Sequence, residues 1–222
     1  MRRLLFLLGA LGSLRAATVS IEIASPGNIY ASQQNVADQG FYVGPYTLVV
    51  NGVTLLGLCV DFSHQSGVGY SWNAFQTPVT SAGMNNTYVY QASASNPNVD
   101  AITLRTYEEE AYLYRKIVAA LLPADRIAIQ EAAWSITYSG FDISNNPEAQ
   151  MWAAAAMDPA NYQRVNLAGL VIYSDAGGIR GGEQEFISIG VADPVGVVPE
   201  PGALGLIAGL LAVACIRVRR RR

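Results

Sequence analysis

The first half of the chain alternates apolar and polar residues in the manner of β-strands. From Thr18 to Ile23 every second residue is apolar, and two further strands are predicted over 46–51 and 53–62. Asn51-Gly52 joins these two strands, and this dipeptide is typical of a two-residue type I′ hairpin turn. The alternation therefore predicts a β-rich first part that contains a tight hairpin.

The spacing of apolar residues then changes to that of helices, with helices predicted over 107–122, 124–137 and 147–157. Thr106 and Glu109 have the spacing of a capping box at the start of the first. Asn146, followed by Pro147, has the pattern of a cap at the start of the third. Two more strands are predicted over 166–174 and 185–191. This order predicts an α+β fold, in which a barrel-like or sandwich-like β-lobe carries an inserted bundle of about three helices.

The two ends of the chain have the composition of targeting segments. Arg2 and Arg3 precede an apolar stretch from Leu4 to Leu14, which is typical of a secretory signal peptide over residues 1–16. Near the other end, an apolar run from Gly202 to Val218 just reaches the length of about 17 residues that can cross a bilayer as a helix. Arginines fill the last positions and favour a cytoplasmic end. We therefore expect an exported protein with a C-terminal transmembrane helix.

The C-terminal tail, residues 198–222, has three parts: a short motif of Pro199, Glu200 and Pro201, the apolar run and a basic stop, in that order. This tail resembles the PEP-CTERM sorting signal of Gram-negative bacteria. The resemblance implies processing by an exosortase. The protein would be held in the inner membrane by its tail and then reach the cell surface or the extracellular polymeric matrix. Residues 17–197 form the remaining ectodomain.

Charge and cysteine content narrow the function of the ectodomain. It holds six basic and sixteen acidic residues, a net charge of −10. Such a domain is a poor ligand for nucleic acid. The acidic run Glu108 to Glu110 is expected to lie in solvent at the start of a helix. Cys215 falls in the apolar tail, so Cys59 has no partner for an internal disulfide in the ectodomain. A single cysteine in an exported domain suggests a functional thiol or a small buried side chain.

Two short segments around Cys59 and Gln130 have a paired pattern. The first is Leu58-Cys59-Val60-Asp61, and in the second Gln130 is followed four residues later by Trp134. They resemble the paired motifs of bacterial surface thioester domains, although Ile129 replaces the usual Thr. The resemblance implies a thioester between the Cys59 sulfur and the Gln130 side chain, with Trp134 shielding it. It also implies a partner at the cell surface, a polysaccharide or protein whose amine or hydroxyl attacks the thioester.

Two polar neighbours of Cys59 are weaker candidates. Asp61 lies two residues after Cys59, on the same face of a strand. His64 is the only histidine and can act as an acid or base. The sequence shows no hydrolase triad, phosphate loop or zinc pattern, so we expect an adhesion module rather than an enzyme, without cofactor or metal. The alternative is a non-covalent structural matrix protein in which Cys59 is buried and inert.

Overall fold

The computed structural model describes residues 18–25, 29–32, 40–80, 83–178 and 182–191. The predicted signal peptide and the predicted sorting tail, with Pro199, Glu200 and Pro201, lie outside these ranges. Among the helices that are described, none combines the length and apolar character needed to cross a bilayer.

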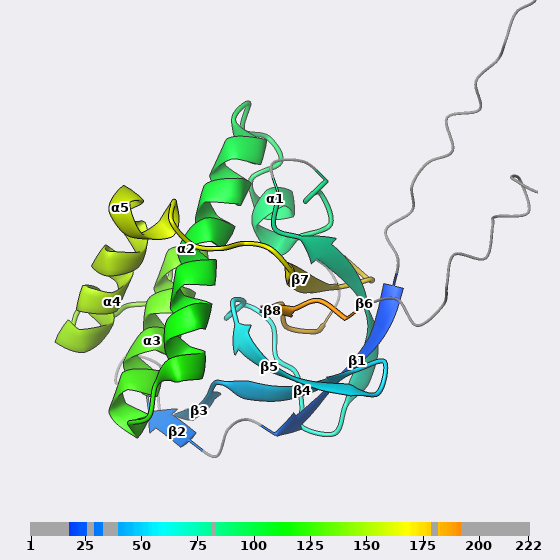
Figure 1. Cartoon of the computed structure of the whole chain (residues 1–222), viewed down its shortest axis with the longest axis horizontal. Coiled ribbons are helices and arrows are strands. Elements are labelled where there is room, and N and C mark those ends of the chain that lie inside the picture. The colour runs from blue at the N-terminus through cyan, green and yellow to red at the C-terminus, as the bar shows by residue number, and fades with distance from the viewer. Residues whose placement is uncertain (1–17, 26–28, 33–39, 81–82, 179–181, 192–222) are drawn as a thin grey trace, which may run out of the picture. The chain divides into compact units, whose positions relative to one another are not determined.

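Six antiparallel strands form a closed barrel in the order β1-β4-β5-β8-β7-β6 (Figure 1). Their bounds are β1 Thr18–Ser25, β4 Tyr46–Val50, β5 Val53–Cys59, β6 Ser71–Pro78, β7 Leu170–Asp175 and β8 Phe186–Ile189. A separate two-stranded sheet pairs β2 Ile29–Ser32 with β3 Gly40–Val43. The α+β fold with a β-barrel is therefore confirmed.

The hairpin between β4 and β5 forms as predicted. Val50 pairs with Val53, and both Asn51 and Gly52 have positive φ angles of 47° and 82°. These angles match a type I′ turn, whose twist suits antiparallel strands. The returning strand is shorter than the predicted 53–62, because it ends at Cys59. Cys59 therefore lies at the rim of the barrel, where helices can reach it.

Five helices lie between β6 and β7 in the described part of the chain, and α2 to α5 lie to one side of the barrel in Figure 1. They are α1 Tyr88–Ala92, α2 Val99–Ala119, α3 Pro123–Thr137, α4 Pro147–Met157 and α5 Pro159–Tyr162. The three long ones correspond to the predicted bundle. The predicted cap of the third is confirmed, because the Asn146 side chain accepts a hydrogen bond from the backbone N–H of Ala149 at 3.1 Å.

The predicted start of the first long helix is wrong. Helix α2 begins at Val99, so Thr106 and Glu109 lie inside it and form no capping box. Thr103, Tyr107 and Ala111 are all buried and follow one another at helical spacing, so the helical face extends one to two turns before Thr106.

The predicted exposure of Glu108 to Glu110 is also wrong for two of the three residues. Glu109 is 4% exposed and Glu110 is fully buried. Because the helix starts earlier, this run is in its middle and not in a solvated first turn. Glu109 pairs with Arg105 at 2.8 Å, whereas Glu110 faces the protein interior.

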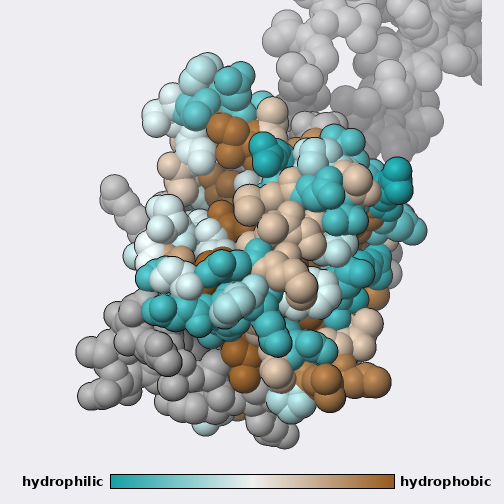
Figure 2. Space-filling model, turned by 90° about the vertical axis from the view of Figure 1, so that its left-hand side faces the viewer, coloured by the Kyte–Doolittle hydropathy of each residue, from teal (hydrophilic) through white to brown (hydrophobic). Residues whose placement is uncertain are grey.

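Two apolar clusters build the core. One fills the barrel with residues from alternate strand positions such as Ile21, Leu48 and Phe186. The other lies between the barrel wall and the helices, where Leu58 and Val60 of the barrel pack with Leu113 and Ile117 of α2. Figure 2 shows one side of the molecule, on which hydrophobic groups are interrupted by hydrophilic ones. Each fully buried Leu or Ile stabilises the fold by about 1.5–3 kcal/mol, so the two clusters hold the helices against the barrel.

Candidate functional site

Cys59 is a free, fully buried cysteine at the end of β5. It pairs with Phe186 of β8, and its side chain belongs to the cluster inside the barrel, between the outward-facing Leu58 and Val60. Its thiol donates a hydrogen bond to the backbone carbonyl of Asp61, with 3.3 Å between sulfur and oxygen. The sulfur thus lies at the barrel rim in a fixed orientation.

Helix α3 brings Gln130 to Cys59 although the two residues are 71 positions apart in the chain. The Gln130 Nε2 donates to the Cys59 backbone carbonyl at 2.6 Å. Its Oε1 accepts from the Gly44 backbone N–H at 3.3 Å. Gln130 is fully buried, and both ends of its amide are held by backbone groups. The predicted pair is therefore in contact, through the Gln130 side chain and the Cys59 backbone.

Gly44 lies between β3 and β4, and its lack of a side chain allows the Gln130 amide to approach. A Cβ atom at this position would lie 3.1 Å from Gln130 Oε1, and 3.3 Å from side-chain atoms of both Ile117 and Tyr46. The Gly44 N–H points to the oxygen that would carry negative charge if the Gln130 carbonyl were attacked. This is the arrangement of an oxyanion-stabilising donor.

Trp134 lies one helical turn beyond Gln130, on the barrel side of α3. It is 2% exposed and packs against Phe62 and Phe141 with ring-centroid distances of 5.2 and 5.4 Å. These three rings belong to or border the cluster that contains Cys59. They form an apolar enclosure at the end of the barrel where the fully buried Cys59 lies.

Burial raises the pKa of the Cys59 thiol well above its usual range. Hydrogen bonds from the Trp134 side chain and at the Asp61 backbone oppose this effect, whereas the negative charges of Asp61 and Glu110 reinforce it. Desolvation disfavours the charged form of any buried acid. The thiol is therefore protonated at neutral pH, and any reaction of the sulfur requires a group that takes its proton.

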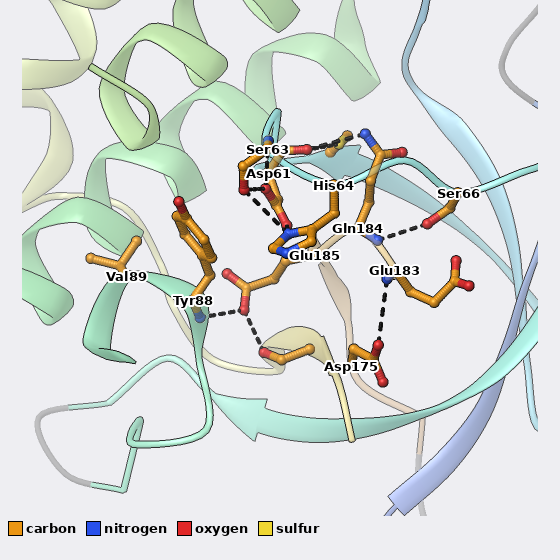
Figure 3. A network of polar contacts seen from close by, with 12 residues as sticks. Asp61, Ser63, His64, Ser66, Tyr88, Val89, Asp175, Glu183, Gln184 and Glu185 are labelled. Atoms are coloured by element: carbon orange, nitrogen blue, oxygen red, sulfur yellow. Dashed lines mark hydrogen bonds and ion pairs between the residues drawn. The ribbon is translucent and has the colours of Figure 1, made fainter. Parts of the chain in front are cut away.

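Asp61 and His64, the two weaker candidates, contact each other directly after β5. The His64 Nδ1 lies 2.5 Å from Asp61 Oδ2, and the Ser63 hydroxyl donates to Asp61 Oδ1 at 2.6 Å (Figure 3). The same Nδ1 also faces the Ser63 hydroxyl at 3.2 Å. A nucleophilic serine triad uses the two ring nitrogens for its two partners, so these three residues do not have triad geometry. The Asp61 backbone carbonyl accepts the hydrogen bond of the Cys59 thiol, so this polar group is connected to Cys59.

A second polar network, centred on Glu185, borders this group and was not predicted from the sequence. The Tyr88 backbone N–H and the Ser174 hydroxyl donate to Glu185 Oε2 at 2.8 and 2.5 Å, and the Tyr107 hydroxyl donates to Oε1. Burial raises the pKa of Glu185 to about 7, against the effect of these donors. Asp61, His64 and Glu185 line a pocket of about 20 Å³, which has room for about one water molecule.

Within the described residues, no group of three or more His, Cys, Asp or Glu side chains is arranged to hold a metal ion. The sequence motifs identify Cys59, Gln130 and Trp134, and the structure brings all three to one end of the barrel. Gly44 could not be identified from the sequence, because the proposed role of this residue depends on its backbone N–H. It also assigned Glu110 to the surface, so a buried acid near Cys59 was missed.

Comparison of the chain with protein-family models, with curated proteins and with solved structures found no match.

Proposed function

We propose that this protein attaches covalently to a partner at the cell surface through a thioester between Cys59 and Gln130. The observation that carries the proposal is the position of the Gln130 amide. It is held between the Cys59 carbonyl at 2.6 Å and the Gly44 N–H at 3.3 Å, in a fully buried site. These contacts hold the Gln130 amide against the residue whose sulfur would attack it, with a backbone donor at its oxygen.

The thioester would form by attack of the Cys59 sulfur on the Gln130 side-chain carbon. The S–C bond forms, the C–N bond breaks and the amide nitrogen leaves as ammonia. During attack the carbonyl oxygen becomes negatively charged, and the Gly44 N–H lies where it stabilises that charge. The fold supplies the orientation of the two groups, and well-oriented reactions of this kind gain several orders of magnitude in rate.

The stored acyl group would then react with an amine or hydroxyl of a partner, leaving Cys59 as a free thiol. Hydrolysis competes with this reaction, so exclusion of water matters. The enclosure by Trp134, Phe62 and Phe141 supports a long-lived thioester. Both reacting residues are fully buried, so a small amine is expected to reach the site faster than a large partner.

The location follows from the tail and is part of the same proposal. The signal peptide over residues 1–16 would export the chain. Exosortase would act near Pro199, Glu200 and Pro201, and the C-terminal helix would hold the protein in the inner membrane until then. The acidic ectodomain would thus reach the cell surface or extracellular matrix, where covalent attachment is useful.

One observation favours a second candidate, a non-covalent matrix protein with an inert Cys59. The Cys59 side chain is fully buried, and burial raises the pKa of its thiol. A protonated thiol inside a barrel behaves as a small apolar side chain. The two candidates differ in whether the native protein has lost ammonia.

Intact mass spectrometry of the purified protein tests this difference. The thioester predicts that the wild type is lighter than its processed sequence by one ammonia. Cys59→Ala and Gln130→Ala should each have the full mass, and Gln150→Ala, a change at an exposed helical glutamine of α4, should keep the deficit. A wild-type protein of full mass that does not react with methylamine would refute the proposal and support the second candidate.

A further inference from the structure

Asp61, Ser63 and His64 form a closed polar group directly after β5, and the proposed thioester chemistry does not use it (Figure 3). Both oxygens of the buried Asp61 carboxyl group are engaged. Oδ1 accepts from the Ser63 backbone N–H at 2.8 Å and from the Ser63 hydroxyl at 2.6 Å, and Oδ2 faces His64 Nδ1 at 2.5 Å. A side-chain oxygen that accepts from the backbone N–H two residues on closes an Asx turn. The residue in the middle of this turn is Phe62.

The turn begins where the chain leaves the barrel. The Asp61 carbonyl accepts from the Gln184 side chain at 3.1 Å and from the Cys59 thiol at 3.3 Å, so the chain is fixed up to this point. Residues 62–70, all of which the structure describes, belong to neither strand nor helix. Phe62 can therefore change position without breaking the pairing of the barrel strands, and the Asp61 carboxylate is the group that holds its turn.

The Phe62 ring is the outer part of the aromatic enclosure. Its centroid lies 5.2 Å from that of Trp134, 4.6 Å from that of Phe141 and 5.8 Å from that of Tyr138. Exposure falls inward along these contacts. Tyr138 is 36% exposed and Phe62 is partly buried, whereas Trp134, Phe141 and the Cys59 beneath them are buried. Phe62 therefore lies between the solvent and the rings that enclose Cys59.

We propose that Phe62 is the gate through which a partner reaches the Cys59–Gln130 thioester, and that Asp61 is the positioning residue that holds this gate closed. With its ring against Trp134, Phe62 covers the enclosure. When the ring moves out with its loop, it leaves an opening about as wide as one phenyl ring. This role rests on the proposed thioester, and it gives Asp61 a function that needs no contact with the reacting atoms.

An opening of this width selects the partner by shape. An unbranched primary amine, such as a lysine side chain, can pass it. A hydroxyl attached directly to a sugar ring cannot, because the ring would have to enter with it. The gate therefore favours a protein amine as the partner. The amine nitrogen bonds to the Gln130 carbon, the S–C bond breaks, and the proton that the amine loses ends on the Cys59 sulfur.

The first measurement uses Cys59 as a free thiol and does not depend on the thioester. In the full chain with Gln130→Ala, native labelling rates are compared for iodoacetamide and for its fluorescein derivative, which has the same reactive group but is much wider. The ratio of the two rates reports the opening, because a change in the thiol pKa alters both rates equally. This matters for Asp61, whose negative charge raises the pKa of the thiol.

Phe62→Ala should raise the ratio of wide to narrow labelling on the order of 10-fold, since one aromatic pair stabilises the closed form by up to about that factor. Asp61→Ala should raise the ratio in the same direction. Asp61→Asn keeps an oxygen that accepts from the Ser63 N–H, and Phe62→Tyr keeps the ring, so both should keep the low ratio. Tyr70→Ala, at an exposed ring of the same loop, is the matched control and should leave the ratio unchanged.

The second measurement uses the thioester of the chain with Gln130 intact. n-Butylamine and cyclohexylmethylamine carry the same primary amine on a narrow and on a wide group, and intact mass follows their addition. The narrow amine should react faster with the wild type, and Phe62→Ala should lower this preference on the order of 10-fold. Equal rates for the two amines in the wild type would overturn the selection of a lysine side chain by the gate.

Thermal unfolding identifies the variants that are folded, and Phe62→Leu takes the place of Phe62→Ala if the alanine variant is not. An unchanged labelling ratio in the folded Phe62 variant would overturn the gate. A raised ratio in that variant, with an unchanged ratio in Asp61→Ala, would overturn the role of Asp61 alone. A wild type that never loses ammonia would overturn the thioester and the choice of partner, whereas the labelling ratios would still decide whether Phe62 covers Cys59.

Discussion

Gly44→Ala tests the part of the site that the sequence did not reveal. The added Cβ would lie 3.1 Å from Gln130 Oε1, which is closer than such contacts normally come. Gly44 does not have a positive φ, so alanine fits its backbone conformation. The added atom therefore acts by pushing the Gln130 amide away. A displacement of about 0.3 Å would lengthen the present 3.3 Å bond to about 3.6 Å, beyond the range of a hydrogen bond.

Loss of one oxyanion donor typically lowers a rate 100- to 1,000-fold. The Gly44–Gln130 bond is already long, so we expect about the lower value, 100-fold, for both thioester formation and its reaction with methylamine. Overpacking should also cost about 1–3 kcal/mol of stability. Time-resolved intact mass gives both rates, and thermal unfolding gives the stability loss.

Gly190→Ala is the control for crowding alone, because its Cβ would meet Val171 at 2.8 Å at the end of the barrel. It should lose stability but keep both rates. Equal rates in Gly44→Ala and Gly190→Ala, at equal folded fractions, would refute the assignment of the Gly44 N–H as the oxyanion donor.

Three further predictions follow from buried contacts. Trp134→Phe keeps a ring but removes the hydrogen bond that lowers the pKa of the Cys59 thiol. With Gln130→Ala also introduced to keep Cys59 a free thiol, the pH dependence of its reaction with iodoacetamide should show a higher thiol pKa than Gln130→Ala alone. An unchanged pKa would contradict this contact. Glu185 has its pKa raised to about 7, so its native form binds a proton more tightly than the unfolded form. The free energy of unfolding should therefore fall by about 3 kcal/mol as pH rises from 4.5 to about 7, and denaturant titrations of Glu185→Gln should lack that part of the slope; an equal slope would refute it. Asn146→Ala removes the α4 cap and the donor to Glu131, and should cost about 1–2 kcal/mol, whereas Asn146→Ser should keep the cap and lose only that donor; equal losses would mean that the cap contributes nothing.

The strands and the hairpin could be predicted because their signals are local. Alternation from Thr18 and the Asn51-Gly52 turn depend on a few adjacent residues, and both are confirmed. Closure of the barrel depends on pairing of β1 with β6, of β5 with β8 and of β6 with β7, between residues far apart in the chain. No single segment contains that information, so the sequence left barrel and sandwich open.

The helix errors have a physical cause in competing local signals. Thr106 and Glu109 have capping-box spacing, but Thr103 and Tyr107 continue the buried face toward Val99. Packing against the barrel outweighs the capping preference of two residues. The same shift moved Glu110 from a predicted solvated turn to the interior, where an acid is rare and has no sequence signature.

The candidate site also combines residues that sequence motifs identify with groups that only the structure shows. Cys59, Gln130 and Trp134 were identified because the two short segments that contain them resemble known motifs. The Gly44 N–H and the network around Glu185 depend on backbone groups and on long-range packing, so only coordinates reveal them.

The central claim is a Cys59–Gln130 thioester, and methylamine labelling followed by peptide mapping tests it most directly. Methylamine should convert the Gln130 side chain to its N-methylamide and release Cys59 as a thiol that alkylates after denaturation. The account predicts this one modified glutamine in the wild type and none in Cys59→Ala. An unmodified Gln130 in the wild type, with Cys59 alkylated to the same extent with and without methylamine, would contradict it.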